Sequence, residues 1–237
     1  MQISKLQTIF EYVRHNTPWK CGLSDEVVFA AAKMAIEDIV CVTEYTKERK
    51  LYRLTGQTGS GKTTRLLPMA LSKCTGKPVI INVGMFAKYY PDYQEIKNQR
   101  DMREITNGFS LKCLYATLNE IAKVGYLIVF DKTLLSVELE RFVHDLLSEN
   151  GYEIEYHIKA VSREQSDAFL RKRMLEQGRI VSDESKDYFY EILTVGLEFL
   201  ARVDNKIIAH VWSVDDELLY AGGVEGAVKA LKTGRGE

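Results

Sequence analysis

The stretch LTGQTGSGKTTRL, residues 54–66, decides the interpretation of this chain. Gly56, Gly61, Lys62 and Thr63 satisfy the pattern G-x-x-x-x-G-K-[ST] of a phosphate-binding loop. Glycines let backbone N–H groups turn inward around phosphate oxygens, and the N-terminus of a following helix adds the positive end of its dipole. The stretch therefore predicts a site for the phosphates of a nucleotide.

We assign nucleotide binding to the loop and the start of its helix, namely Gly56, Gly59, Ser60, Gly61, Lys62, Thr63 and Thr64. Lys62 is expected to reach the β- and γ-phosphates of ATP as a catalytic residue, and the Thr63 hydroxyl to bind Mg²⁺. Asp131 ends the apolar run LIVFD, and P-loop enzymes use a carboxylate at such a position to hold Mg²⁺. Thr63 and Asp131 are thus the predicted metal site if their strands are neighbours, although an acid at a strand end can also cap a turn.

The rest of the chain alternates between strands and helices. Strands are expected at 50–55, 79–82, 126–131, 152–161, 206–212 and 217–222, and helices at 62–73, 110–123, 136–149, 164–177 and 184–202. Pro68 is unfavourable within the first of these helices. The alternation predicts a three-layer α/β/α fold with a mainly parallel five-stranded sheet and a terminal antiparallel hairpin. Two amphipathic helices precede it, so we divide the chain into an N-terminal helical extension, 1–49, and a P-loop domain, 50–237.

The bulk composition is typical of a soluble globular protein, with 46% hydrophobic and 27% charged residues. A net charge of −1 gives no support to a nucleic-acid or membrane-surface partner held by bulk charge. The N-terminus is too polar for a signal peptide, and no apolar run is long enough to span a bilayer. The four cysteines are far apart, without the spacing of metal ligands, and indicate free thiols. We therefore expect a cytoplasmic protein.

A basic segment, RKRMLEQGR, covers residues 171–179. Catalysis of phosphoryl transfer depends mainly on positioning and on stabilisation of negative charge, so arginines are expected among the catalytic residues. Arg173 and Arg179 are candidates for this role. The same cluster can also be a solvated basic helix end that is favoured by the helix dipole.

Five segments together resemble the zeta-toxin family of P-loop kinases. They are GQTGSGKTT, VIINVGMFAKYYPDYQEI, GYLIVFDKT, NGYEIEYHIKAVSREQS and RKRMLEQGRIVSDES, spread over residues 50–223 in matching order and spacing. The resemblance implies a P-loop kinase-type fold and an enzyme that phosphorylates UDP-N-acetylhexosamines with ATP and is often held by an antitoxin. At matching positions it implies that Lys62 and Thr63 bind ATP and Mg²⁺. It also implies that Thr133 lies on the sugar-nucleotide side and that the two arginines contact the phosphates being transferred.

The acceptor half departs from the family pattern. Gly84 stands where the family has an aspartate that serves as general base toward the sugar hydroxyl. Tyr90 occupies the position of a histidine in the family pattern, and Asp131 that of a glutamate. Leu135 occupies the position at which the family often has an arginine. Loss of a general base typically costs about 10²- to 10⁴-fold in rate. We expect a weakened or redirected activity, with Asp131 as a substitute base.

Asn82, Thr133 and Tyr89 are the predicted acceptor-binding residues. Asn82 lies at a strand end, and Tyr89 belongs to a group with Tyr90 and Tyr93 that can stack on a base or a sugar. Asn82 and the tyrosines also have a structural interpretation, since the amide can make a strand-end hydrogen bond and the tyrosines can pack their loop against the domain.

Three functions follow from these patterns. The leading one is an ATP- and Mg²⁺-dependent kinase that phosphorylates a hydroxyl of a UDP-N-acetylhexosamine or a related nucleotide-containing small molecule, with an antitoxin as protein partner. The second is an ATP-binding protein that has lost catalysis and acts through a partner. The third is a kinase acting on nucleic-acid ends or modified bases, and the near-zero net charge argues against it.

Overall fold

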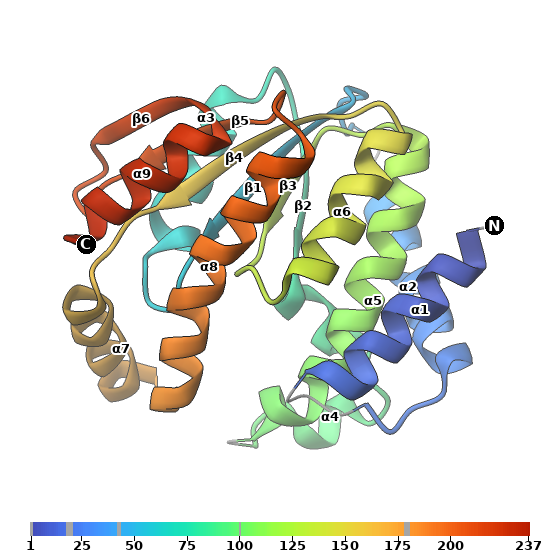
Figure 1. Ribbon diagram of the computed structural model, residues 1–237. Coiled ribbons are helices and arrows are strands. Elements are labelled where there is room, and N and C mark those ends of the chain that lie inside the picture. The colour runs from blue at the N-terminus through green and yellow to red at the C-terminus, as the bar shows by residue number, and fades with distance from the viewer. Residues whose placement is uncertain (1, 18–20, 42–43, 100, 178–180) are drawn as a thin grey trace.

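A computed structural model describes residues 2–17, 21–41, 44–99, 101–177 and 181–237. Its centre is a six-stranded sheet with the order β2-β3-β1-β4-β5-β6 (Figure 1). The strands are β1 (Lys50–Gly56), β2 (Val79–Asn82), β3 (Ile128–Asp131), β4 (Glu153–Lys159), β5 (Ile208–Trp212) and β6 (Leu218–Gly223). The first five are parallel, and β6 runs antiparallel to β5. The predicted parallel sheet with a terminal hairpin is confirmed.

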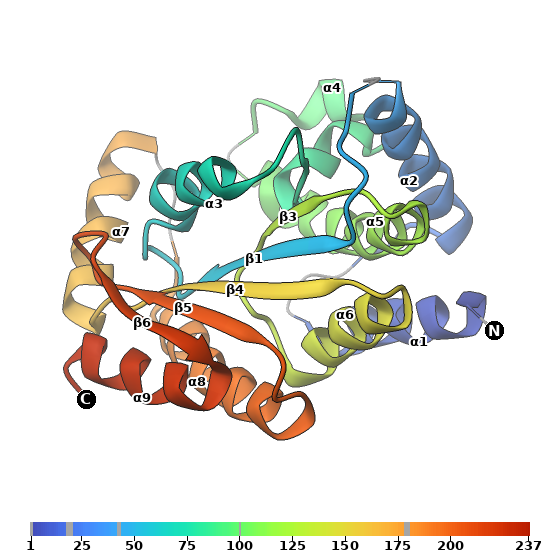
Figure 2. The ribbon, with the colours of Figure 1, turned by 90° about the horizontal axis from the view of Figure 1, so that it is seen from above.

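Helices cover both faces of this sheet. They are α1 (Gln2–Asn16), α2 (Asp25–Val40), α3 (Leu67–Lys73), α4 (Tyr93–Ile96), α5 (Met102–Val124), α6 (Val137–Glu149), α7 (Arg163–Gln177), α8 (Asp183–Val203) and α9 (Val224–Arg235). Figure 2 shows α3 on one side of the sheet and α6, α8 and α9 on the other. Buried residues of β1 alternate accordingly, because Tyr52 and Leu54 pack with Leu66 beneath α3 whereas Leu51 joins the core on the opposite face.

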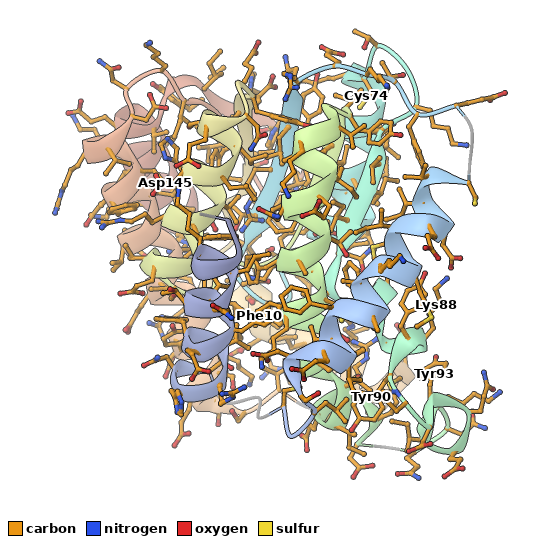
Figure 3. All side chains as sticks on the ribbon, turned by 90° about the vertical axis from the view of Figure 1, so that its right-hand side faces the viewer. Phe10, Cys74, Lys88, Tyr90, Tyr93 and Asp145 are labelled. Atoms are coloured by element: carbon orange, nitrogen blue, oxygen red, sulfur yellow. The ribbon has the colours of Figure 1, made fainter. Side chains whose placement is uncertain are left out.

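The N-terminal helices α1 and α2 pack against α5 (Figure 3). Phe10 of α1 and Val28 of α2 are fully buried and belong to the same hydrophobic core as the sheet. The buried ammonium of Lys112 in α5 lies 2.9 Å from Asp25, which gives it a countercharge. Helices α1 and α2 therefore share a core with the rest of the described chain, while a separate N-terminal extension over residues 1–49 remains a prediction.

The segment after the phosphate-binding loop differs from the expected single helix. Residues Lys62–Leu66 form a wide π-helical turn, and the regular helix α3 starts only at Leu67. Pro68 lies in the first turn of α3, where a missing N–H has no helical partner to lose. The proline is thus accommodated by placing the change of helix type just before it.

Two other helices were not predicted correctly. Helix α5 begins at Met102, earlier than the expected residue 110, because exposed Arg103 and Glu104 dilute the apolar pattern of its first turns. Helix α9 was missed, since Gly226 and Gly234 lower its helix propensity. Its buried Val224, Ala227 and Leu231 do carry helical spacing.

Candidate active site

The carboxyl ends of four strands meet at one edge of the sheet. Leu54 of β1 and Asn82 of β2 are both register partners of Asp131 in β3, and Gly56 pairs with Lys159 of β4. The phosphate-binding loop thus emerges between two strands that lie far from it in sequence. In open parallel sheets ligands bind at this edge, where the strand order reverses.

The loop itself is packed against α7. Gly59 has φ of +81°, and a Cβ on it would lie 2.8 Å from Cγ of Leu170 and 2.9 Å from the carbonyl oxygen of Ser166. The Ser166 hydroxyl donates a hydrogen bond of 2.6 Å to the carbonyl of Thr58. Only glycine satisfies both the left-handed backbone and the close approach of α7.

Lys62 and Thr63 occupy the positions that the motif predicts. Lys62 Nζ donates to the carbonyl oxygens of Gly56 and Gln57, both at 2.9 Å, so the ammonium is folded onto the loop. Thr63 Oγ1 donates to Asp131 Oδ2 at 2.6 Å. The condition that the two strands be neighbours is met, and a hydroxyl beside a carboxylate is a set of hard oxygen donors that fits Mg²⁺.

Two further loop residues have distinct surroundings. Thr64 Oγ1 donates to the carbonyl of Gly61 at 3.2 Å, which stabilises the turn into the helix. Ser60 is buried, and its Oγ finds no hydrogen-bond partner among the described residues. An unpaired hydroxyl in a phosphate-binding loop is consistent with a site shaped for an added acceptor such as a phosphate oxygen.

A buried polar network supports the turn that follows Asp131. Arg53 of β1 donates to the carbonyl of Lys132 and makes two hydrogen bonds of 2.9 Å to the Glu140 carboxylate in α6. Tyr156 of β4 donates to the same carboxylate at 2.7 Å. Each charge in this network has a partner, as burial requires. This network was not predicted from the sequence, although a lone arginine inside an apolar strand indicates a buried ion pair.

Lys132 and Thr133 follow Asp131 in the same turn. The Lys132 ammonium is buried and donates to the Tyr115 hydroxyl at 3.1 Å. Burial, together with the nearby charge of Arg53, lowers the pKa of Lys132 to about 7. Thr133, next in the chain, is partly exposed, and its place on the acceptor side stays a prediction.

The other acceptor candidates have structural partners. Asn82 Oδ1 accepts a hydrogen bond of 3.1 Å from the backbone N–H of Met85 and so caps the short 3-10 helix Val83–Tyr89. The Tyr89 hydroxyl donates at 2.6 Å to Asp38 of α2, which also binds Lys88, labelled in Figure 3. Their roles in acceptor binding remain predictions.

Gly84, where the resemblance implies a general base, is exposed. A Cβ added there would meet only Oδ1 of Asn82, at 3.3 Å. The backbone is not in the left-handed region that excludes side chains. The glycine is therefore not demanded by its local geometry.

One of the two candidate arginines lies within the described residues. Arg173 lies on α7, partly buried, and burial together with the charge of Arg103 lowers its pKa. Arg179 lies outside the described residues. The proposed contact of both with the transferred phosphate stays a prediction.

A second polar cluster lies away from this edge, on the α3 side of the sheet. His157 Nε2 and His210 Nε2 each lie 3.0 Å from Oε1 of Glu155, so the three side chains together resemble a set of metal ligands. Trp212 Nε1, however, donates to His157 Nδ1 at 3.3 Å, which leaves the proton of a neutral His157 on Nε2. His157 therefore donates to Glu155, and lysines 50 and 73 also bind this carboxylate. The cluster is explained by hydrogen bonds and ion pairs.

Comparison with known proteins assigns the family. The Zeta toxin family model matches residues 35–223. This chain belongs to the Zeta toxin family. The match starts within α2, earlier than the resemblance starting at residue 50, and ends before α9.

Individual relatives agree with this assignment. Toxin PezT of Streptococcus pneumoniae serotype 4 is 29% identical over 115 residues, which cover 48% of this chain and 45% of that toxin. The chain thus matches less than half the length of this curated relative. A solved structure from the PezAT toxin-antitoxin system of Streptococcus pneumoniae has a TM-score of 0.72 at 21% identity, covering 89% of this chain and 87% of the other. The AvrRxo1-ORF1:-ORF2 complex with ATP has a TM-score of 0.54 at 13% identity, covering 93% of this chain and 66% of the other. These two structures share its fold.

Two remaining expectations concern the whole chain. Within the described ranges, no helix combines the length and the apolar character that a membrane crossing requires. The four cysteines are free thiols, as predicted, with Cys113 buried and Cys41 exposed.

Proposed function

We propose that this Zeta toxin family protein is an ATP-dependent kinase that phosphorylates a hydroxyl of a UDP-N-acetylhexosamine or a related nucleotide-containing small molecule. The observation that carries the proposal is the contact of Thr63 with Asp131 directly beside the Lys62 loop. It unites a hydroxyl, a carboxylate and a cation at the carboxyl edge of a parallel sheet, as phosphoryl transfer from ATP requires.

In the proposed reaction, an oxygen of the acceptor hydroxyl bonds to the γ-phosphorus while the bond from that phosphorus to the β–γ bridging oxygen breaks, and ADP leaves. Lys62 would exchange its contacts with the Gly56 and Gln57 carbonyls for β- and γ-phosphate oxygens. The Thr63 hydroxyl and the Asp131 carboxylate would hold Mg²⁺, which supplies neutralisation of phosphate charge. Arg173 and Arg179 are proposed to stabilise the charge on the transferring group.

The acceptor proton needs a destination, and we assign it to a carboxylate oxygen of Asp131. Gly84 offers no side chain for this purpose, whereas Asp131 lies at the neighbouring strand end. A loose transition state develops little charge on the attacking oxygen, so it depends more on phosphate stabilisation than on a strong base. The proposed reaction therefore has an acceptor for the proton, although we expect it to be slower than with a dedicated general base at position 84.

A second function is favoured by the same glycine. Because a Cβ on Gly84 would meet only Oδ1 of Asn82, the fold does not demand the loss of the carboxylate, and a protein that binds ATP without transferring phosphate is the alternative function. Such a protein would act through a partner. The neighbouring structures are described as a toxin-antitoxin system and as a two-component complex, which supports proposing an antitoxin-like protein partner for this chain.

The test is mass-spectrometric detection of phosphate transfer from Mg·ATP to a panel of UDP-sugars, nucleosides and dinucleotides. We expect a phosphorylated UDP-sugar with the wild type and none with Lys62→Ala. Transfer retained by Lys62→Ala would contradict the assigned donor site. ATP binding without any product would replace the kinase by the binding protein, and a phosphorylated dinucleotide alone would favour a nucleic-acid substrate.

A further inference from the structure

The last turn of α9 reaches the phosphate-binding loop through one side chain. Arg235 is only 4% exposed, and its Nη2 donates to Oε1 of Gln57 at 3.2 Å. Its Nη1 donates to the Thr194 hydroxyl of α8 at 3.0 Å, and the guanidinium carbon lies 3.8 Å from the ring centre of Tyr190. A Cβ on Gly234 would lie 2.8 Å from the Ala160 side chain, so this turn sits tightly against the end of β4.

Gln57 connects this arginine to two parts of the site. It is the residue after the first glycine of the motif and is 2% exposed. Its Oε1 accepts from Arg235, its Nε2 donates to the carbonyl of Val161 between β4 and α7, and its own carbonyl accepts from Lys62. Both the oxygen and the nitrogen of the Gln57 amide therefore have hydrogen-bond partners. A displacement of Arg235 would displace the phosphate-binding loop and the start of α7, the helix that carries Arg173.

The positive charge of Arg235 is incompletely balanced. The carboxylate found beside it belongs to Glu237, at 3.9 Å, with a side chain that is 38% exposed. Nε of Arg235 has no hydrogen-bond partner among the described residues. A cation removed from water costs free energy unless something compensates it, and its field is screened less than that of a surface charge. A negatively charged ligand on the adjacent loop would provide this compensation.

We propose that Arg235 is a positioning residue for the triphosphate. Acting through Gln57, it holds the phosphate-binding loop and the start of α7 in the arrangement that accepts phosphate oxygens, and its charge favours an anion there. The inference rests on the ATP binding of the proposed function, and it assigns a role to α9, which lies beyond the residues matched by the family.

The first test compares ATP dissociation constants, measured by calorimetry, for the wild type, Arg235→Met and Arg235→Lys. We expect Arg235→Met to weaken ATP binding about tenfold or more, as for the loss of a hydrogen bond to a charged group. Arg235→Lys keeps the charge and one donor and should recover part of the affinity. Equal affinities for all three proteins would overturn the proposal.

Matched variants separate positioning from general destabilisation. Leu231→Ala removes a fully buried side chain one turn earlier on α9 and should leave ATP affinity unchanged at a temperature where it is folded. If Gln57→Leu and Arg235→Met act through one link, their combined effect on affinity is smaller than the sum of the single effects. Additive effects, or an equal loss of affinity in Leu231→Ala, would refute the link.

Hydrogen exchange of the nucleotide-free protein gives a readout that does not need ATP binding. The amides of residues 56–61 should exchange faster in Arg235→Met than in Leu231→Ala. Unchanged exchange in the loop would overturn the positioning role. If the loop exchanges faster in Arg235→Met than in Leu231→Ala but the wild type does not bind ATP, the positioning role stands and the proposed function is contradicted instead.

Discussion

Gly84 allows the chemistry of the acceptor side to be tested at one residue. The position is exposed, and a Cβ would meet only Oδ1 of Asn82, at 3.3 Å, so a side chain fits if the Asn82 amide shifts by a few tenths of an ångström. We predict that Gly84→Asp raises the rate of phosphate transfer by about 10²-fold or more, because it supplies a general base. Gly84→Asn has nearly the same shape without the base and should keep the wild-type rate. The measurement is the initial rate of phosphate transfer at saturating Mg·ATP. Equal rates for Gly84→Asp and Gly84→Asn would exclude this position from proton transfer.

Replacing Asp131 tests the proposed metal site at a single residue. The Asp131→Asn side chain keeps its size but loses the negative charge that a divalent cation prefers. In the wild type, removal of Mg²⁺ by EDTA is expected to weaken ATP binding. In Asp131→Asn, ATP affinity should be nearly independent of Mg²⁺. A full Mg²⁺ effect in the variant would show that the cation is held elsewhere.

At the scale of elements, the contact of α7 with the phosphate-binding loop limits what the loop can tolerate. Gly59→Ala introduces both a strained left-handed alanine and a Cβ 2.9 Å from the backbone oxygen of Ser166. We predict a lower melting temperature and a loss of ATP binding of at least tenfold. Gly223→Ala, where a Cβ meets nothing within 4 Å, is the matched control and should change neither. ATP binding unaffected in Gly59→Ala would mean that the loop does not need this helix.

The contact of Thr63 with Asp131 could be anticipated because a short motif has strict backbone demands. The motif predicted Lys62 and Thr63, and Asp131 was predicted by analogy with the strand-end acid of P-loop enzymes, on the condition that the two strands be neighbours, which the structure meets. The residues that hold this edge together come from distant elements, so no local pattern groups Arg53 with Glu140, or Gln57 with Arg235. Their partnership depends on strand order, which a sequence pattern does not specify.

Among the helices and strands, those with a clear local pattern were predicted and those that depend on packing were not. Strands buried on both faces stand out as apolar runs, and these predictions were confirmed. Helix α9 was missed because three of its buried residues are spread among glycines and lysines, a pattern whose meaning depends on packing against β5 and β6. Tyrosines 89 and 90, which the sequence allows either to stack on a ligand or to pack their loop against the domain, contact Asp38 and Phe109 from neighbouring helices, and their acceptor-binding role stays a prediction.

For the whole molecule, the shared core predicts that the N-terminal helices unfold together with the sheet. Phe10 is fully buried against α5, so Phe10→Ala should lower the free energy of unfolding by about 3–5 kcal/mol. Leu175→Ala, at a side chain that is 82% exposed, should change it by less than about 0.5 kcal/mol. Chemical denaturation monitored by circular dichroism measures both. A separate early transition in the Phe10 variant would show that α1 and α2 unfold independently.

The buried cluster of Glu155, His157 and His210 predicts a loss of stability in acid. Burial lowers the pKa of His157 and of His210 below the ordinary histidine value, against the opposing hydrogen bond or charge of Glu155, while lysines 50 and 73 add like charge. Because their folded pKa values are lowered, the unfolded chain binds more protons as the pH falls through about 6.5. The free energy of unfolding should therefore decrease from pH 7 to pH 5.

Denaturant titrations across this pH range measure the effect. Replacing His157 by Gln should reduce the pH dependence, because the side chain no longer titrates. An identical slope in His157→Gln and the wild type would assign the acid sensitivity to other groups.

The strand order has a consequence for protein synthesis. A ribosome completes the loop that holds Lys62 long before it makes β3 or β4, the two strands between which β1 lies. Until the chain has passed Lys159, the loop has neither its carboxylate partner Asp131 nor a strand on its other side, and Arg235 arrives later still. A nascent chain therefore carries the whole phosphate-binding motif without a working site. The site can therefore form only after the chain has been made through Asp131, Lys159 and Arg235, far beyond the motif that marks it in the sequence.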